Sequence, residues 1–137
     1  GYSMLHMQGY PIDMQENPNY QDVIESLISF FKLKIKELES LGFTNIIIDP
    51  GFGFGKNIED NYKILKELNL FQSLEKPIMV GLSRKSMIYK VLNISPQEAL
   101  NGTTVLNTIA LEKGANILRV HDVKEAMECK KLLAKLY

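Results

Sequence analysis

The chain has 137 residues, of which 45% are hydrophobic and 23% charged, the proportions of one compact globular domain with its own core. Equal numbers of basic and acidic residues give a net charge of zero, so no overall field favours nucleic acid or a membrane surface as a partner. A single cysteine, Cys129, excludes an internal disulfide, and neither a membrane-length apolar run nor a signal-peptide pattern is present, so we expect a cytoplasmic protein.

Short apolar runs alternate with helical patterns along the whole chain. Branched apolar residues predict buried strands, and i, i+3, i+4 apolar spacing predicts amphipathic helices. In chain order we expect a strand at 4–7, a helix at 20–41, a strand at 46–48, a helix at 58–71, a strand at 78–82, a helical region at 85–92, a helix at 101–113, a strand at 117–120 and a helix at 123–137.

Several residues predict where the helices begin, end and face. Gly42 is expected to end the helix at 20–41 as a C′ glycine. Ser95 and Glu98 have the spacing of a capping box with Pro96 between them, which predicts another helix start. In the last helix we expect Ala126, Met127 and Leu133 to face inward.

This β-α-β-α-β-α-β-α order is typical of a parallel sheet covered by helices. A closed barrel and an open doubly wound sheet both fit it. A complete (β/α)₈ barrel takes about 250 residues and eight such units, whereas this chain supplies four. We therefore expect one domain over residues 1–137 that forms about half of a larger β/α architecture.

Polar clusters follow the last three predicted strands, where the working residues of parallel β/α folds lie. They are residues 49–56, Asp-Pro-Gly-Phe-Gly-Phe-Gly-Lys, residues 83–86, Ser-Arg-Lys-Ser, and residues 119–121, Arg-Val-His. Because the carboxyl ends of parallel strands meet at one edge, we expect these clusters to form one anion-handling active site.

The first cluster combines a carboxylate with a glycine-rich loop. Asp49 stands at the rim of the core and suits a ligand edge with two N–H donors, although a turn-capping role is the alternative. The alternating glycines allow positive φ, and Phe52 and Phe54 offer aromatic faces to a flat substrate. The spacing matches neither a Walker loop nor a dinucleotide fingerprint.

The other two clusters carry cations. Two cations at a helix start oppose the helix dipole, and a bound anion would relieve that conflict, although Lys85 also fits a solvated surface lysine. Arg119 and His121 alternate with Val120, so they share one face and are spaced to hold a phosphate or pyrophosphate together. A purely structural histidine is the alternative for His121.

Taken in order, these clusters, with Met7-Gln8-Gly9 after the first strand, resemble those of dihydropteroate synthases. The resemblance runs over essentially the whole chain. It implies a TIM (β/α)₈ barrel fold, with this chain supplying strands five to eight, the C-terminal half. It also implies folate biosynthesis: p-aminobenzoate displaces pyrophosphate from 6-hydroxymethyl-7,8-dihydropterin pyrophosphate, with Mg²⁺ on the diphosphate, and sulfonamides occupy the p-aminobenzoate site.

The resemblance also implies roles for individual residues. The catalytic residues would be Asp49, Lys85 and Arg119. The pterin would be bound by these three together with Gly81 and Leu5, and the pyrophosphate by Arg119 and His121. The p-aminobenzoate side would be lined by Phe54, Lys85, Ser86 and Pro11. No residue of this chain is expected to ligate a metal, because the Mg²⁺-linked asparagine belongs to the missing strands. Late helices would pair two subunits into a homodimer.

Two further interpretations stay open. A pterin-binding methyltransferase barrel shares the fold, although a methyl transfer has no pyrophosphate for Arg119 and His121 to hold. A non-catalytic half barrel, serving only as a folding or dimerisation unit, is the other. Half a barrel leaves two strand edges open and apolar positions bare, so we expect the chain alone to be inactive and to self-associate.

Overall fold

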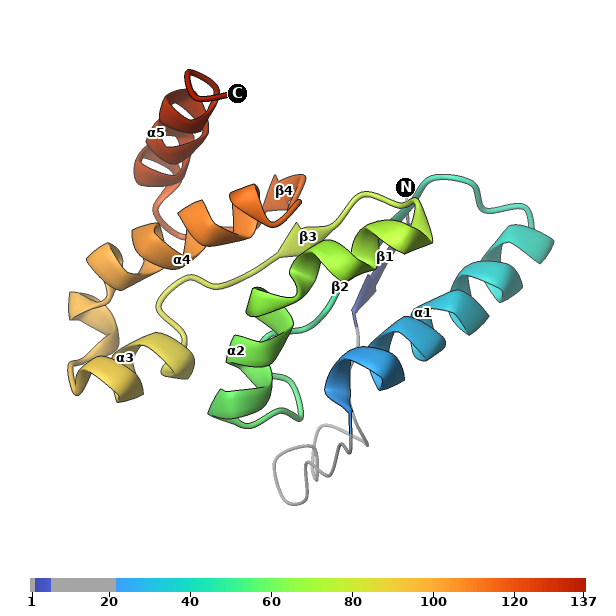
Figure 1. Ribbon diagram of the computed structural model, residues 1–137, viewed down its shortest axis with the longest axis horizontal. Coiled ribbons are helices and arrows are strands. Elements are labelled where there is room, and N and C mark those ends of the chain that lie inside the picture. Colours follow the sequence, from blue (N-terminus) through green and yellow to red (C-terminus); the bar gives the residue numbers. More distant parts are fainter. Residues whose placement is uncertain (1, 6–21) are drawn as a thin grey trace.

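The computed structural model describes residues 2–5 and 22–137, which alternate between strands and helices as the sequence predicts (Figure 1). The elements are β1 Tyr2–Leu5, α1 Val23–Ser40, β2 Ile46–Asp49, α2 Ile58–Lys66, the 3₁₀ helix η1 Leu68–Leu74, β3 Met79–Val80, α3 Ser86–Leu92, the 3₁₀ turn η2 Pro96–Glu98, α4 Leu100–Glu112, β4 Ile117–Leu118 and α5 Val123–Leu133. Residues 6 and 7 of the predicted first strand lie outside the described residues.

The strands are parallel, and each lies beside the next one in the chain. β1 pairs with β2, and β3 pairs with β4. An isolated parallel bridge from Ile48 to Ile78 joins the two pairs. A doubly wound sheet would reverse its strand order at a switch point, whereas a barrel keeps chain order. Of the two architectures left open by the sequence, the described strands therefore have the order of a barrel segment.

Two strands are shorter than predicted, because side chains and turns replace the ladder at their ends. The predicted strand at 78–82 is reduced to β3, and that at 117–120 to β4. At Ile78 the amide donates to the side-chain oxygen of Asn116 rather than to a strand. Beyond β3 the chain turns at Arg84, which has a φ of 54°. The polar residues Ser83, Arg84 and Lys85 therefore lie in a turn rather than in the strand.

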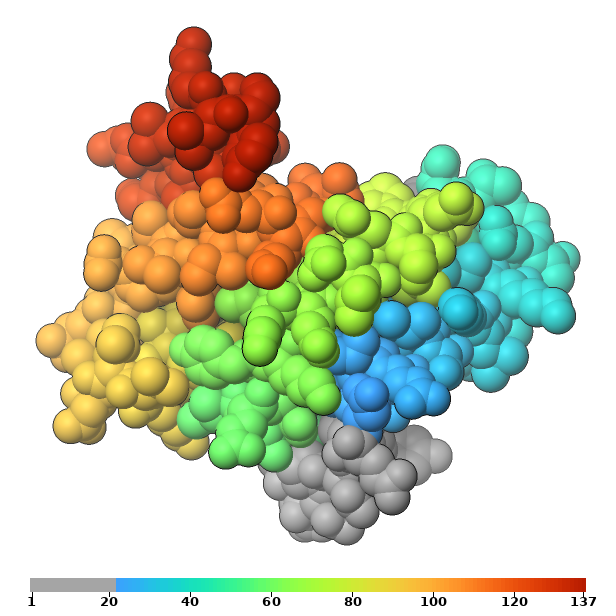
Figure 2. Space-filling model, viewed as in Figure 1, coloured from blue at the N-terminus to red at the C-terminus, as the bar shows by residue number. Residues whose placement is uncertain are grey.

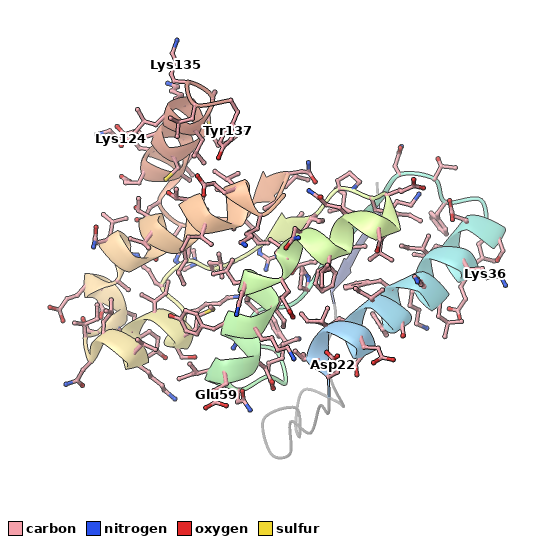
Figure 3. The ribbon with its side chains drawn as sticks, in the orientation of Figure 1. Asp22, Lys36, Glu59, Lys124, Lys135 and Tyr137 are labelled. Carbon is pink, nitrogen blue, oxygen red and sulfur yellow. The ribbon has the colours of Figure 1, made fainter. Side chains whose placement is uncertain are left out.

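The amphipathic helix α1 covers the sheet with the face that the sequence predicts. Its buried residues are Val23, Ile24, Leu27, Phe31 and Ile35. Asp22 caps its start by accepting from the amides of Ile24 and Glu25, at the end of the helix where Figure 3 labels it. Leu41 is the C-cap residue and Gly42 follows with a φ of 93°, so the predicted C′ glycine is confirmed.

The helix predicted at 58–71 is wrong in its second half. The α-helix ends at Lys66, and a 3₁₀ helix follows. With three residues per turn, a 3₁₀ helix keeps every third side chain on one face. Leu68, Phe71 and Leu74 are all buried, and the Phe71 ring meets that of Phe31 at a centroid distance of 6.3 Å. The tighter helix therefore buries three apolar side chains in a row.

Helix α5 stands out from the rest of the molecule (Figures 1 and 2). Ala126 is buried as predicted, but Met127 is 45% exposed, which contradicts the expected inward position, and Cys129 takes the buried place. The main packing partner of α5 is α4, and its buried residues are Ala126 and Cys129. The Ser95–Glu98 capping box forms, but it starts the short turn η2 and α4 begins only at Leu100.

Among the described residues, every helix is too short or too polar to span a membrane.

Candidate active site at the carboxyl ends of the strands

An ion pair joins the ends of β2 and β4. Asp49 is 1% exposed, and its Oδ2 atom accepts a hydrogen bond of 2.7 Å from Nη1 of Arg119. Its Oδ1 atom accepts from the Gly51 amide at 2.9 Å, so the predicted turn-capping alternative is also realised. The Arg119 side chain is 51% exposed. A buried carboxylate thus faces a half-exposed guanidinium that a ligand can reach.

The backbone of Gly81 lies directly against that guanidinium. A Cβ atom at Gly81 would lie 2.5 Å from Nη2 of Arg119, closer than any real contact. Gly81 is buried, and it follows β3 directly. The resemblance implies a place for Gly81 on the pterin side, and the structure adds a physical reason for a glycine here: any side chain at this position would displace the guanidinium of Arg119 from its present place.

The glycine-rich loop is held from below by a buried lysine. Lys56 is 2% exposed, and its Nζ atom donates to the carbonyl oxygens of Gly51 and Phe54, each at 2.9 Å. Gly51, Gly53 and Gly55 all have positive φ, as the sequence predicts. Burial lowers the pKa of Lys56 to about 8, with Lys85 adding to the shift and Asp49 and Asp60 opposing it. The lysine therefore acts within the loop rather than at the surface.

The two phenylalanines of this loop differ in burial. Phe52 is fully buried in the core, so the expectation that it offers an aromatic face to a substrate is wrong. Its apolar ring is more stable packed against the core than exposed beside the loop. Phe54 is partly exposed, and Nζ of Lys85 lies 5.3 Å from its ring centroid. The ring available to a flat ligand is that of Phe54.

Lys85 turns into the site, against its alternative as a surface lysine. Its Nζ atom donates to the Phe52 carbonyl oxygen at 2.7 Å, and its side chain crosses the glycine loop. Burial lowers the pKa of Lys85 to about 8; Arg119 lowers it further, and Asp49 opposes the shift. Lys85, Asp49 and Arg119 therefore interact electrostatically, as their assignment to one site requires.

The remaining predicted residues are placed less closely. His121 is exposed, and its backbone amide donates to Oγ of Ser83 at 3.1 Å. Ser86 is partly buried at the first position of α3. The backbone of Leu5 pairs with Asp49 in the β1–β2 register, at the edge of the site. Pro11 lies outside the described residues.

Arg84 does not join the site. Its guanidinium forms a two-bond pair with Asp122 and donates to two loop carbonyl oxygens, so the expectation that both cations of the Ser83–Ser86 cluster await an anion is wrong for this one. The pairing partner lies 38 residues further along the chain, beyond the reach of any local pattern. Lys85 alone of the two faces the glycine loop.

Sequence reasoning gave no role to two residues that shape the loop: Lys56 was named only as the last member of the 49–56 cluster, and Asn61 was not singled out. Asn61 is 2% exposed, and its Oδ1 atom accepts from the Gly53 amide at 2.9 Å. It lies three residues after Ile58, on the inward face of α2. A polar residue inside an otherwise apolar stripe is a signal that could have been noticed. Lys56 offered no such signal, because its burial follows from the path of the loop.

The described residues include no group of three or more His, Cys, Asp or Glu side chains that could hold a metal ion. A cavity of about 390 Å³ lies between α4 and α5 and is lined by Thr104, Thr108 and Cys129 among others. It is remote from Asp49, Lys85 and Arg119, so it does not belong to the candidate site.

Comparison with known proteins agrees with this geometry. Residues 1–121 match the family model described as pterin binding enzyme. The chain is 44% identical over 132 residues to dihydropteroate synthase of Escherichia coli K12, covering 95% of this chain and 47% of that protein. Yersinia pestis dihydropteroate synthase in a sulfonamide drug complex superposes with a TM-score of 0.94 at 40% identity, covering 98% of this chain and 50% of the other.

A third similar structure is that of Thermus thermophilus dihydropteroate synthase in complex with 4-aminobenzoate. Its TM-score is 0.93 at 33% identity, and the match covers 98% of this chain and 56% of that one. The chain thus spans about half the length of the relatives it matches. The predicted half-barrel extent and the resemblance are both confirmed.

Proposed function

The chain belongs to the pterin binding enzyme family, and on that premise we propose that it is part of a dihydropteroate synthase of folate biosynthesis. In this proposal residues 1–137 are the C-terminal half of a (β/α)₈ barrel. The observation that carries it is that Asp49 pairs with Arg119 while Lys85 donates to the Phe52 carbonyl oxygen, in the loop that directly follows Asp49. The carboxylate can accept hydrogen bonds from the edge of a ring, and the two cations beside it can bind an anion.

The reaction joins the amine nitrogen of p-aminobenzoate to the methylene carbon of the pterin and breaks the bond from that carbon to pyrophosphate, which leaves with the bonding electrons while the amine gives up one proton to solvent. Asp49 would accept hydrogen bonds from the pterin edge, and Arg119 would turn from Asp49 to cover the pterin and, with His121, hold the pyrophosphate. Because Arg119 is half exposed while Asp49 is buried, the guanidinium is the partner that is free to move. Gly81 and Leu5 would lie beside the pterin.

Phe54, Ser86 and Pro11 would line the p-aminobenzoate side, with Lys85 between the two substrates. The Lys85 ammonium already lies near the Phe54 ring and a carbonyl oxygen, so its position is fixed before substrate arrives. Catalysis in this proposal is positioning, plus electrostatic stabilisation of the departing pyrophosphate by the cations that hold it. No covalent enzyme intermediate is needed.

Further parts of the proposal concern partners. Mg²⁺ would be held through the pyrophosphate and the other half of the barrel; the described residues offer no cluster for it, so no step is assigned to it here. Exposed apolar residues on α4 and α5 and just beyond α5, namely Val105, Ile109, Met127, Leu132 and Leu136, fit a homodimer surface formed by late helices. A role in folate synthesis would make the protein cytoplasmic.

The test supplies the rest of the barrel. The chain is mixed with the part of the E. coli relative that precedes the matched region, and dihydropteroate formation is measured with each fragment alone as control. We expect turnover only in the mixture, because four strands carry only part of the site. A complex that forms without turnover would refute the proposal in favour of a structural half barrel. Sulfonamide affinity that does not rise with pyrophosphate would favour a methyl-transferring relative.

A further inference from the structure

Arg84 adopts a backbone conformation that non-glycine residues rarely adopt. Its φ is 54°, in the left-handed region, in the segment that links β3 to α3. Such a conformation costs of the order of 1 kcal/mol or more and persists where surrounding contacts hold it. The next residue is Lys85, which reaches into the candidate site. The contacts that hold Arg84 therefore also fix the backbone of Lys85, from which its side chain extends into the site.

Those contacts come from three separate segments. Nε and Nη2 of Arg84 donate to the two carboxylate oxygens of Asp122 at 3.0 and 3.1 Å. Nη1 donates to the carbonyl oxygens of Pro96 and Gln97, at 2.9 and 2.7 Å. The Arg84 amide donates to Oγ1 of Thr103 at 3.0 Å. The planar fork of an arginine, with its five donors, suits such a set, whereas a lysine offers one point charge.

The Arg84–Asp122 pair joins the two segments that carry Lys85 and His121. Asp122 is next to His121, whose amide donates to Oγ of Ser83, the residue before Arg84. Two contacts thus join the loop after β3 to the loop after β4: the Arg84–Asp122 pair and the Ser83–His121 hydrogen bond. The Arg84 hydrogen bond lowers the pKa of Asp122, so its carboxylate is charged at neutral pH.

We propose that the Arg84–Asp122 pair is a positioning device that sets Lys85 and His121 in register across two loops, without either member touching the substrate. The inference rests on the proposed function for what Lys85 and His121 bind. It goes beyond that function by giving roles to two charged residues that are not ligands. The Arg84 guanidinium donates four hydrogen bonds within the protein, so its charge holds loops together.

The first experiment needs no ligand. Hydrogen exchange is followed at the His121 amide of the 137-residue chain in three variants. Arg84→Gly removes the fork but accepts a positive φ without strain, so its fold is kept. Arg84→Lys keeps the charge without the two-bond geometry. Lys76→Met breaks the surface pair of Lys76 and Glu39, 3.4 Å apart, as a matched control away from the site.

We expect exchange at His121 to quicken about tenfold or more in Arg84→Gly, by a smaller factor in Arg84→Lys, and not at all in Lys76→Met. Unchanged protection in Arg84→Gly would overturn the proposal, because the pair would then hold nothing at the second loop. This readout is independent of what the site binds, so it decides the proposal even if the proposed function fails.

The second experiment separates positioning from direct binding. Pyrophosphate affinity is measured by calorimetry at several salt concentrations for the reconstituted barrel built with the unmodified chain, with Arg84→Gly or with Arg119→Met. We expect Arg84→Gly to weaken binding about tenfold with an unchanged salt dependence, because no ligand charge is lost. Arg119→Met should weaken binding and flatten the salt dependence. An equal flattening in Arg84→Gly would make Arg84 a ligand and overturn the proposal. No pyrophosphate binding by the barrel reconstituted with the unmodified chain would count against the proposed function alone.

Discussion

The buried ammonium of Lys56 makes stability depend on pH in a direction opposite to that of a salt-bridged lysine. Burial lowers the pKa of Lys56 from 10.5 to about 8. Between these two pH values the unfolded chain keeps a proton that the folded chain has released. Stability therefore rises with pH through this window, because the unfolded state binds more protons.

The size of the effect follows from the two pKa values. One pKa unit corresponds to about 1.4 kcal/mol, and between about pH 7 and about pH 9.5 the shift gives a gain of about 2 kcal/mol in the free energy of unfolding. Lys85, whose pKa is also lowered to about 8, adds a gain of the same sign. The pKa of Tyr62 is raised by burial, so ionisation of that phenol opposes the gain only at higher pH.

The assay is urea unfolding at low protein concentration across this pH range, followed by far-ultraviolet circular dichroism because the chain has no tryptophan. In Lys56→Met the rise should be smaller by about 2 kcal/mol. Lys66→Met removes an exposed lysine from the neighbouring helix and serves as control. A Lys56→Met variant that keeps the full rise would refute the reasoning, since the shifted proton would then belong elsewhere.

Three further substitutions test the candidate site. Gly81→Ala should push the Arg119 guanidinium from its present place and weaken pterin binding, measured by pterin fluorescence; unchanged affinity would mean that Arg119 does not need that position. Asp49→Asn replaces the charged acceptor of Arg119 with an amide, which offers either a donor or a weaker acceptor. It should lower the free energy of unfolding by about 1–3 kcal/mol in a denaturant titration, and a change near zero would count against the ion pair. Phe54→Leu removes the ring beside Lys85. The sulfonamide dissociation constant of the reconstituted barrel should rise a few-fold, which corresponds to a loss of about 0.5–1 kcal/mol in binding free energy, and calorimetry can detect or exclude this change.

Local patterns predicted the elements well because each depends on neighbours in sequence. The buried face of α1 and the glycine at position 42 are set by helical periodicity and by φ alone. The strand ends were placed correctly enough for the sequence alone to bring Asp49, Lys85 and Arg119 together. The change to a 3₁₀ helix after Lys66 could not be predicted, because it depends on how tightly the core holds Phe71 and its neighbours.

Within the site, the errors came from contacts between residues far apart in sequence. Arg84 and Lys85 are adjacent cations and look equivalent, yet one is neutralised by Asp122 and the other crosses the glycine loop. Phe52 and Phe54 likewise alternate in the same loop, and only the fold decides which ring enters the core. Ligand roles stay predictions for all of these residues, because they depend on half a barrel that this chain does not contain.

The ion pair between Asp49 and Arg119 also spans the junction of the two strand pairs. Backbone pairing joins β1 to β2 and β3 to β4, while the isolated bridge at Ile48 and Ile78 connects the pairs. Asp49 belongs to the first pair, and Arg119 follows the second. A ligand that draws Arg119 away from Asp49 therefore alters the coupling between the two pairs. By thermodynamic linkage, whatever holds the pairs together changes ligand affinity by the same factor. The association of the two strand pairs and the filling of the site are in this sense a single equilibrium.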